Sequence, residues 1–596
     1  MISANSDIKR KFFLISQIGF FFFVFSLIYL GSFEFNNERG FTLFDDAMIG
    51  MRYAYNFAQT GLIEWSNASG NVEGLTNIGW MLILSLITKI FSLSISPLIV
   101  SLVSLLFLIL GFFVLTTQNS KYRELENVYK FSAFAGSISL LFWGIRGFEV
   151  SILFFIFCIV FTYISSQQKS ILFSVFTLFT IFYGSFIRDD FAIIIILFLC
   201  LKTIFDSLIY KKFFIRKNTL YLLGFTFISI LLKTYLRYEY FGEILPNTYY
   251  LKVYGHSKIV LIIRGLLSIL KNIFSGVLLV PTLTCISLFF YSRKSTLYVL
   301  NKFKETNSIA LIISFFIYNV LTGGDAWEWS GLLNRFLCIA EPFIILNTFI
   351  FLKNFVAIKK SSSKNFVYKN NISYLPVIIF TILSFLTIYL INTAHNLKII
   401  DGMGSYQSHL LHTFIIFITL FSQIVLIKLL KLNSAEILNF KIFPIILLGY
   451  YLITPSISLL KEYSSTKYLM PSLPHIRDDA SMAITAFKSR EIIPDGSTAV
   501  SVWAGTLPYF LPKVDFIDPL GKMDKYIART EPRRPFFPGH TKWDWQYTLN
   551  TYKPKYIFGI YQPKCIDTWL HDCSKEELEN YEQLTLSPAI MIRKIN

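Results

Sequence analysis

The stretch Phe44-Asp45-Asp46-Ala47-Met48-Ile49-Gly50-Met51-Arg52-Tyr53-Ala54-Tyr55-Asn56-Phe57 directly follows the first long apolar segment, and the rest of the chain is organised around it. Asp45, Arg52 and Asn56 recur at the spacing of one helical face, which predicts a helix with a polar stripe. Asp46 lies on a neighbouring face of the same helix. Two adjacent carboxylates here are either a solvated helix start, where acids suit the helix dipole, or a reactive site.

The composition is that of a membrane protein with many spans. Of 596 residues, 54% are hydrophobic and only 15% are charged, so a soluble chain would lack polar surface. Apolar runs of about 20 residues recur, which is the length that crosses about 30 Å of hydrocarbon. The first run, residues 12–33, is longer than a signal-peptide core and has no small-residue cleavage site. We therefore expect it to be retained as a span.

The positive charge follows the membrane topology. The net charge is +18, and the basic residues gather in short loops between apolar runs, as the positive-inside rule describes. Such a pattern does not indicate nucleic-acid binding. Lys9, Arg10 and Lys11 precede the first run, so the N-terminus is expected in the cytoplasm.

The run at 78–90 is short for a span and is expected to be interfacial or re-entrant. The remaining loops then alternate cleanly, and about 13 transmembrane helices are expected. After the first run they lie at about 97–117, 131–145, 150–165, 171–187, 191–210, 219–236, 273–291, 308–322, 334–352, 374–391, 410–428 and 442–460. The predicted fold is an all-α membrane domain, residues 1–460 with a first outer loop at 33–96, followed by an extracytoplasmic soluble domain at 461–596.

The C-terminal region is expected to form a small α/β or α+β domain. Runs typical of strands lie at 498–503, 514–517, 556–560 and 589–592, and helical segments lie around 478–488 and 573–582. The loops at 515–524 and 538–544 are basic and aromatic, so they either cover an anionic or sugar ligand or are ordinary surface loops. Cys565 and Cys573 are either a disulfide or two free thiols.

Polar turns gather at the predicted outer ends of the spans. Each turn alone would be explained by interfacial anchoring or a local salt bridge, but five on one face indicate a shared cavity. They are the Asp45-Asp46 loop, Arg146-Gly147-Phe148-Glu149, Arg188-Asp189-Asp190, residues 241–252, and Gly323-Gly324-Asp325 with the following aromatic residues and Asn334-Arg335 close behind.

Carboxylates at an outer membrane boundary suit a general base that acts on a sugar hydroxyl. Arginine and lysine at the same place suit a departing phosphate. Together they describe glycosyl transfer from a lipid-linked sugar. The sequence has no Gly-rich phosphate loop after a strand and no His/Cys cluster with zinc spacing.

The first outer loop carries a family resemblance. Asp45-Asp46, Arg52-Tyr53 with Asn56, Trp65-Ser66-Asn67 and Val72-Glu73-Gly74-Leu75-Thr76 resemble the opening loop of the terminal β-arabinofuranosyltransferases of mycobacterial cell-wall assembly and their bacterial relatives. Those enzymes are polytopic glycosyltransferases of the GT-C superfamily. The similarity continues, in order, through the turns at Arg146, Arg188, Leu245-Pro246-Asn247-Thr248 with Lys252, Gly323-Gly324-Asp325 with Arg335-Phe336, and Gly539-His540 with Lys542.

Four positions depart from the family pattern and leave the sugar identity open. Leu75 stands where the family has tyrosine, Phe148 where it has leucine, Val150 where it has threonine, and Asp189 where it has proline. The resemblance therefore implies an inverting transferase that moves arabinofuranose or another sugar. The donor would be a polyprenyl phosphate and the acceptor a cell-envelope glycan or glycoconjugate. The reaction would take place on the periplasmic face of the bacterial inner membrane.

The resemblance also implies roles for individual residues. Asp45 or Asp46 would deprotonate the acceptor, with Arg52 holding that acid ionised. Arg188, Lys252 and Arg335 would bind the donor phosphate. The sugar and acceptor residues would be Arg52, Tyr53, Asn56, Glu73, Glu149, Asp190, Asn247, Asp325 and His540. No cofactor is required by the spacing, and a divalent cation stays open because some GT-C enzymes use one.

Two other classes of protein act on the same lipids. A lipid-linked glycan flippase should carry its polar residues near the middle of the bilayer on broken helices. An O-antigen-type polymerase or ligase should have a large central outer loop rather than a large C-terminal domain. The polar clusters of this chain lie at span ends on one side, which favours the transferase.

Overall fold

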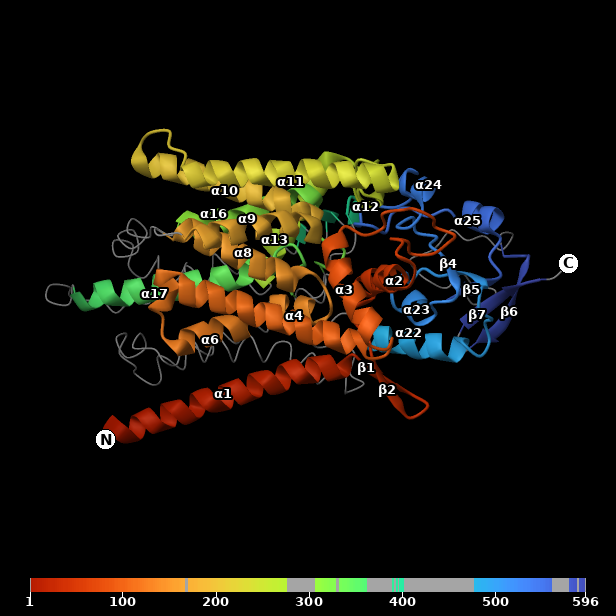
Figure 1. The fold of residues 1–596 in the computed structure, drawn as a ribbon, viewed down its shortest axis with the longest axis horizontal. Helices are drawn as coiled ribbons and strands as arrows, with labels where there is room; N and C mark the ends of the chain where they lie inside the picture. The colour runs from red at the N-terminus through yellow and green to blue at the C-terminus, as the bar shows by residue number, and fades with distance from the viewer. Residues whose placement is uncertain are drawn as a thin grey trace.

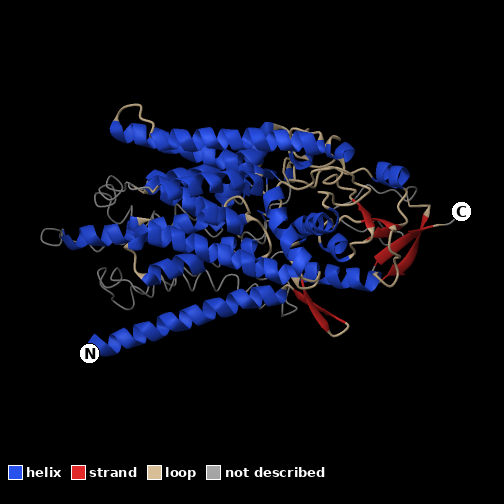
Figure 2. Ribbon diagram, viewed as in Figure 1, coloured by secondary structure: helices blue, strands red, loops and turns tan. Residues whose placement is uncertain are grey.

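The computed structural model describes residues 2–166, 170–275, 306–328, 332–361, 389–390, 393–394, 396–400, 476–559, 578–586 and 589–594. An elongated group of helices occupies most of the molecule, and a smaller part with a β-sheet lies at one end (Figures 1 and 2). The N-terminus lies at the opposite end. We call the end of the helical part that meets the C-terminal domain the docking end.

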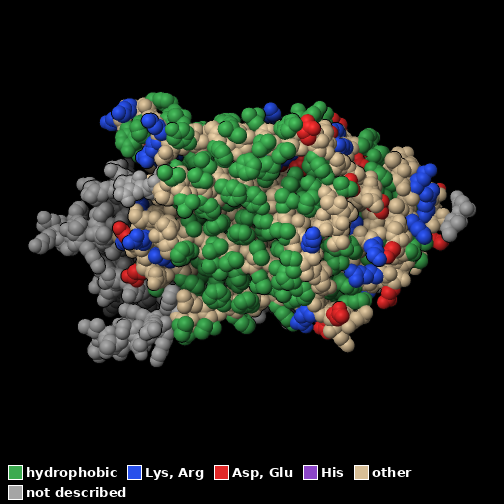
Figure 3. Space-filling view, viewed as in Figure 1, with side chains coloured by type: hydrophobic (Ala, Val, Ile, Leu, Met, Phe, Trp, Pro, Cys, Tyr) green, Lys and Arg blue, Asp and Glu red, His purple; other side chains and the backbone are tan. Residues whose placement is uncertain are grey.

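The helical part is mostly apolar. Its helices are α1 Ile2–Leu30, α4 Ser96–Phe113, α6 Asn127–Gly136, α7 Ile138–Ile145, α8 Val150–Ser165, α9 Ile171–Ile187, α10 Asp189–Tyr210, α11 Lys217–Phe241, α13 Lys258–Ser275, α16 Thr306–Thr322 and α17 Glu341–Ser361. Hydrophobic side chains cover the middle of its visible face, and charged side chains gather towards the ends (Figure 3).

These helices fit a membrane domain, but the predicted number of spans is not confirmed. Among the described residues, three helices are long and apolar enough to cross a membrane, or four if the pair α6–α7, bent by 57°, is one span. Helices α8, α9 and α16 are apolar but shorter. The spans predicted at 374–391, 410–428 and 442–460, and most of 273–291, lie outside the described residues, as do Cys565 and Cys573.

The short apolar run forms α3 (Ile78–Ile90), and both of its ends lie at the docking end. At its start, Tyr183 Oη on α9 donates to the Gly79 carbonyl at 3.0 Å. A Cβ on Gly79 would lie 2.8 Å from the Phe186 carbonyl carbon, so only glycine allows this approach. Beyond its end, Tyr509 of the C-terminal domain donates to the Leu93 carbonyl at 3.2 Å. Helix α3 therefore does not traverse the helical part.

The C-terminal domain contains a mixed five-stranded sheet in the order β4-β3-β5-β7-β6. Strands β3 (Thr498–Val500), β4 (Asp515–Ile517) and β5 (Tyr556–Phe558) are parallel, while β7 (Ala589–Arg593) runs antiparallel to β5. All four correspond to predicted strands. The predicted helix at 573–582 is wrong at its end, because Tyr581 and Glu582 begin strand β6 (Tyr581–Leu586), which pairs with β7. The domain's helices are α22 Ile476–Ser489, α23 Thr506–Phe510, α24 Lys525–Ala528 and α25 Trp545–Tyr552.

A hairpin that the sequence analysis did not predict follows α1. Strands β1 (Ser32–Phe35) and β2 (Glu38–Phe41) pair antiparallel around Asn36 and Asn37. Both asparagines have positive φ, 49° and 63°, as a two-residue type I′ turn requires. The first span was predicted to reach residue 33, whereas α1 ends at Leu30.

The predicted helix with the acidic start is α2 (Asp45–Thr60), and its polar stripe holds the C-terminal domain. The Arg52 guanidinium is buried and donates to four backbone carbonyls, those of Trp65 at 2.9 Å, Pro508 at 2.9 Å, Leu511 at 3.5 Å and Val514 at 3.2 Å. Trp65 Nε1 donates to the Ala504 carbonyl at 3.0 Å, and Ser66 Oγ to the Phe516 carbonyl at 2.7 Å. The first loop is thus a docking surface.

Replacing Arg52 by methionine should loosen this docking. The change leaves buried carbonyls of the C-terminal domain without donors, and hydrogen bonds from a charged group contribute about 1.5–3 kcal/mol each. We expect a lower melting temperature and faster proteolysis of the 476–594 region in the purified protein. Arg39→Met is the matched control, because Arg39 forms an exposed pair with Glu34 at 3.3 Å. Equal protease resistance of the Arg52 and Arg39 variants would contradict this role.

Candidate active site

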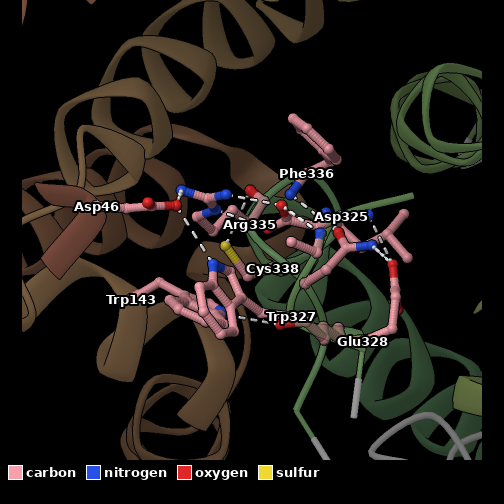
Figure 4. A network of polar contacts seen from close by, with 12 residues as sticks. Asp46, Trp143, Asp325, Trp327, Glu328, Arg335, Phe336 and Cys338 are labelled. Atoms are coloured by element: carbon pink, nitrogen blue, oxygen red, sulfur yellow. Dashed lines mark hydrogen bonds and ion pairs between the residues drawn. The ribbon is translucent and has the colours of Figure 1, made fainter. Parts of the chain in front are cut away.

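The Asp46 carboxylate at the start of α2 lies at the centre of a polar cluster between the helical part and the C-terminal domain. Its Oδ2 accepts from Arg335 Nη1 at 3.1 Å and from Trp327 Nε1 at 3.3 Å (Figure 4). Its Oδ1 accepts from Lys522 Nζ at 3.1 Å. The aspartate therefore joins side chains from two distant segments, the connection between α16 and α17 and the C-terminal domain.

Arg335 is fixed by a fork-shaped pair with Asp325. Its Nε and Nη2 donate to the two carboxylate oxygens at 2.6 and 2.7 Å, and Nη1 is left to reach Asp46. The guanidinium also lies over the Phe148 ring, 4.7 Å from its centroid. Planar bidentate pairing of this kind sets the orientation of an arginine as well as its charge.

Buried polar side chains hold the segment that carries Asp325 in place. Arg264 on α13 donates to the carbonyls of Gly323 at 2.6 Å and Asp325 at 2.9 Å. Glu328 Oε1 accepts from the Asp325 N–H at 2.9 Å and from Asn334 Nδ2 at 2.5 Å. These contacts hold Asp325 and its described neighbours in place, which is what a preorganised site needs.

Lys252 adds a further cation at the end of α12 (Asn247–Lys252). It makes no hydrogen bond or ion pair within the described part of the chain. Its Cε lies 3.5 Å from where a Cβ on Gly539 would stand, so the C-terminal domain packs against it. Burial, followed by the nearby Arg335 and Lys522 cations, lowers the pKa of Lys252 to about 8, and Asp325 and Asp46 oppose this shift.

The two acids at the start of α2 have opposite surroundings. Burial raises the pKa of Asp46, but Lys522, Arg335 and Lys252 outweigh it and hold that pKa well below its ordinary value. Burial raises the pKa of Asp45, and the Thr506 N–H, which donates to Asp45 Oδ1 at 2.7 Å, opposes the rise only in part. Asp46 is thus the firmly ionised member, and Asp45 is tied to α23 of the C-terminal domain.

His540 approaches the cluster as a neutral side chain. Its ring lies 4.8 Å from the Phe537 ring and 6.3 Å from the Trp327 ring, centroid to centroid. Burial, with help from the nearby lysines, lowers the pKa of His540 to about 4, and Asp46 opposes this shift. With His540 neutral, three cations and two carboxylates leave the cluster with one net positive charge.

The His540 pKa predicts a pH dependence of stability. An unfolded histidine binds a proton below about pH 6.5, whereas His540 in the folded protein does so only near pH 4. Between these values the unfolded state binds more protons, so lowering the pH destabilises the fold by up to about 3 kcal/mol. Between pH 7 and pH 4, the melting temperature of the His540→Gln variant should therefore fall less than that of the wild type. His256, whose pKa is also about 4, is present in both proteins and cancels. Parallel melting curves would contradict this.

A second ionic group lies behind Arg335. Arg188 pairs with Glu149 at 2.6 Å and Asp190 at 2.9 Å, and its guanidinium lies 4.8 Å from the centroid of the Phe336 ring. Phe336 is the neighbour of Arg335, so this group supports the segment that carries it. Both partners are largely buried carboxylates, and they engage Nη1 and Nε of the Arg188 guanidinium.

A third ionic group ties the first loop to α11. Arg237 holds Glu73 through two hydrogen bonds at 2.5 and 3.0 Å and also reaches Asp189 at 2.7 Å. Burial raises the pKa of Glu73 to about 7, against the opposing Arg237 charge. Glu73 is therefore a structural partner here, not a member of the Asp46 cluster.

Other predicted site residues also make structural contacts. Tyr53 Oη donates to the Val72 carbonyl at 2.7 Å, and Asn56 Nδ2 donates to the Glu64 and Trp65 carbonyls at 3.0 and 2.9 Å. Arg52 does not contact Asp45 or Asp46, so the expectation that it holds an acid ionised is wrong. Asn247 contacts the C-terminal domain instead of Asp46. The structure thus gathers Asp46, Lys252, Asp325, Arg335 and His540 in one place.

Two members of the cluster were missed by the sequence analysis. Lys522 lies in the predicted basic loop at 515–524, but no local signal separates it from Lys525. Trp327 was predicted only to lie in the polar turn of Asp325, as one of the aromatic residues that follow it. The signal that could have found them is the pairing of the outer loops with the C-terminal domain, which only the tertiary structure shows.

Neither a protein family nor a curated protein matches this sequence. The solved structures with a similar fold include two of ArnT from Cupriavidus metallidurans. The apo form has a TM-score of 0.46 at 12% identity, covering 87% of each chain. The form bound to undecaprenyl phosphate has a TM-score of 0.48 at 11% identity, covering 86% of each chain.

Proposed function

We propose that this protein is a membrane glycosyltransferase that moves a sugar from a polyprenyl-phosphate donor to a glycan acceptor. One observation carries the proposal: an ionised Asp46 lies among three cations, and one of them, Lys252, has no partner within the described residues. A base and a phosphate-binding group are therefore present in the same cluster. That is the pair of functions that inverting transfer from a sugar phosphate requires.

The geometry assigns a role to each member. Asp46 takes the proton of the acceptor hydroxyl, and its lowered pKa means that it is ionised, and so able to accept, before the reaction begins. Lys252 and Arg335 face the departing phosphate as a point charge and a fixed guanidinium. Asp325 orients Arg335 through the bidentate pair. Asp45 does not act as the base in this scheme, because its carboxylate is engaged by Thr506.

The remaining residues support the cluster or line its approaches. Arg188, with Glu149 and Asp190, holds the segment of Arg335 from behind, and Trp327 and His540 offer the flat apolar faces that sugars pack against. The donor sugar, arabinofuranose or another, would lie over these faces. Within the described residues, no three His, Cys, Asp or Glu side chains are arranged so that they could hold a metal ion. The phosphate partners in this proposal are lysine and arginine.

The proposal includes the sidedness of the reaction. The acidic helix, the polar turns and the C-terminal domain all meet at the docking end (Figure 1). The loop between α10 and α11, with Lys211, Lys212 and Arg216, lies at the other end. By the positive-inside rule this basic loop supports a docking end outside the cytoplasm, which in the proposal is the periplasmic face of an inner membrane.

The test is release of polyprenyl phosphate by the purified protein. It is incubated with defined polyprenyl-phospho-sugars and a cell-envelope glycan, and lipid monophosphate is measured. Lys252→Met should lower kcat/KM by about 100-fold, as loss of one electrostatic stabiliser typically does. Lys513→Met is the matched control, since Lys513 is an exposed lysine of the C-terminal domain paired with Asp495. No release with any donor, or equal activity of the two variants, would contradict the proposal.

A further inference from the structure

Lys522 is a cation that the C-terminal domain supplies to the base. Its ammonium lies 3.1 Å from Asp46 Oδ1, and both side chains keep about a fifth of their surface exposed, 20% and 18%. The other carboxylate oxygen of Asp46 already accepts from Arg335 and Trp327. Within the described part of the chain, the ion pair of Lys522 is with this one oxygen of Asp46.

The backbone around Lys522 is built to hold it in place. Asp518 accepts from the N–H groups of Leu520 and Met523, both at 2.9 Å, and closes the loop around them. Gly521 has a φ of +79°, and a Cβ there would lie 2.7 Å from Ile527 Cγ2, so only glycine fits. The Asp518 loop is thus a rigid turn with Lys522 at its tip.

Helix α12 also contacts this turn, through its first residue. Asn247 Nδ2 donates to the carbonyls of Gly521 and Lys522, both at 3.0 Å. Asn247 begins α12, and Lys252 ends it. One short helix therefore fixes the turn of Lys522 at its first residue and carries Lys252 at its last. The two lysines are thus positioned by the same element.

The charges of Asp46 and these two lysines must be balanced before and after transfer. A polyprenyl-phospho-sugar is a phosphodiester with one negative charge, so with Asp46⁻, Lys522⁺ and Lys252⁺ the sum is zero. After transfer the base is neutral, and the lipid monophosphate carries close to two negative charges at pH above its second pKa of about 6. With the same two lysines the sum is again zero. The charge that Asp46 loses is the charge that the phosphate gains.

We propose that Lys522 is a further catalytic residue, which passes from the base Asp46 to the leaving phosphate during transfer. This inference rests on the proposed function and deepens it. The acceptor O–H bond breaks and its proton goes to Asp46, while the acceptor oxygen bonds to the sugar's anomeric carbon. The bond from that carbon to the phosphate oxygen breaks, and its electron pair stays on the phosphate. Neutralised Asp46 releases Lys522, which then stabilises the new charge.

A binding cycle tests this without turnover. Asp46→Asn imitates the protonated base, so Lys522 is released and undecaprenyl monophosphate should bind about tenfold more tightly than to the wild type. Lys522→Met alone should change affinity less than threefold by this reasoning, since Asp46 occupies Lys522 at rest. In the double variant the tenfold gain should disappear. Binding is measured on the purified full-length protein at about pH 8, where the probe is a dianion.

The cycle includes a matched control and a second substitution. Asp495→Asn with Lys513→Met removes the same kind of pair from the surface of the same domain and should leave affinity unchanged. Lys522→Gln replaces Lys522→Met if the latter does not fold. A gain that persists in the double variant, or no gain in Asp46→Asn, overturns the role of Lys522 alone. Failure of the wild type to bind the monophosphate overturns the phosphate site, and the proposed function with it.

Discussion

Asp46→Asn is expected to lower the rate of sugar transfer by about 1,000-fold without unfolding the protein. The amide cannot accept the acceptor's proton, and loss of a general base costs about 10²–10⁴ in rate. The amide oxygen can still accept from Arg335 or Trp327, so the cluster keeps much of its geometry without Lys522. The measurement is kcat for polyprenyl phosphate release, with melting temperature recorded in parallel.

Asp45→Asn is the matched control, one residue away on the same helix. Its oxygen accepts from the Thr506 N–H, which an asparagine also allows, so transfer should fall less than about tenfold. A rate loss as large as that of Asp46→Asn would show that the wrong acid has been assigned. Full turnover by Asp46→Asn would remove the proposed base.

Arg335→Met is expected to abolish most transfer and also to destabilise the protein. It leaves the almost fully buried Asp325 carboxylate without its bidentate partner, and breaking a buried pair costs about 3–5 kcal/mol. The kcat/KM for transfer should fall about 100- to 1,000-fold relative to the wild type, because a fixed phosphate partner is lost. Both quantities are measured on the same preparation, as melting temperature and as kcat/KM.

The double change Arg335→Met with Asp325→Asn separates the two effects. Removing the orphaned charge should restore much of the melting temperature, yet transfer should stay low because no guanidinium faces the phosphate. Arg335→Lys should keep part of the activity, since it retains the charge but not the fork. Recovery of transfer together with stability in the double variant would show that Arg335 is only structural.

The order of polar turns along the chain predicted much of what meets at the docking end. Asp325, Arg335 and Lys252 all follow apolar runs, and such span ends converge on one face once the helices pack side by side. Helix α2 and four strands of the C-terminal domain also follow from local periodicity. These features depend on spacing alone, which is why a single sequence is enough for them.

The sequence could not show which partner each side chain of α2 faces in the folded protein. Asp45 and Asp46 are chemically alike, and only the seating of α23 against α2 turns one towards Thr506 and leaves the other to the cations. Arg52 looked like a partner for an acid, yet it binds four backbone carbonyls of segments distant in the sequence. Lys522 becomes a site residue only because Asn247 and Asp518 hold its turn.

The most direct test of the central claim is the position of a lipid phosphate in an experimental structure of the full-length protein with undecaprenyl monophosphate. We predict that its phosphorus lies next to Lys252 and Arg335, beside Asp46, with the lipid chain running along the helical part. A phosphate bound at the opposite end, among Lys211, Lys212 and Arg216, would contradict the assignment of this cluster as the site of transfer.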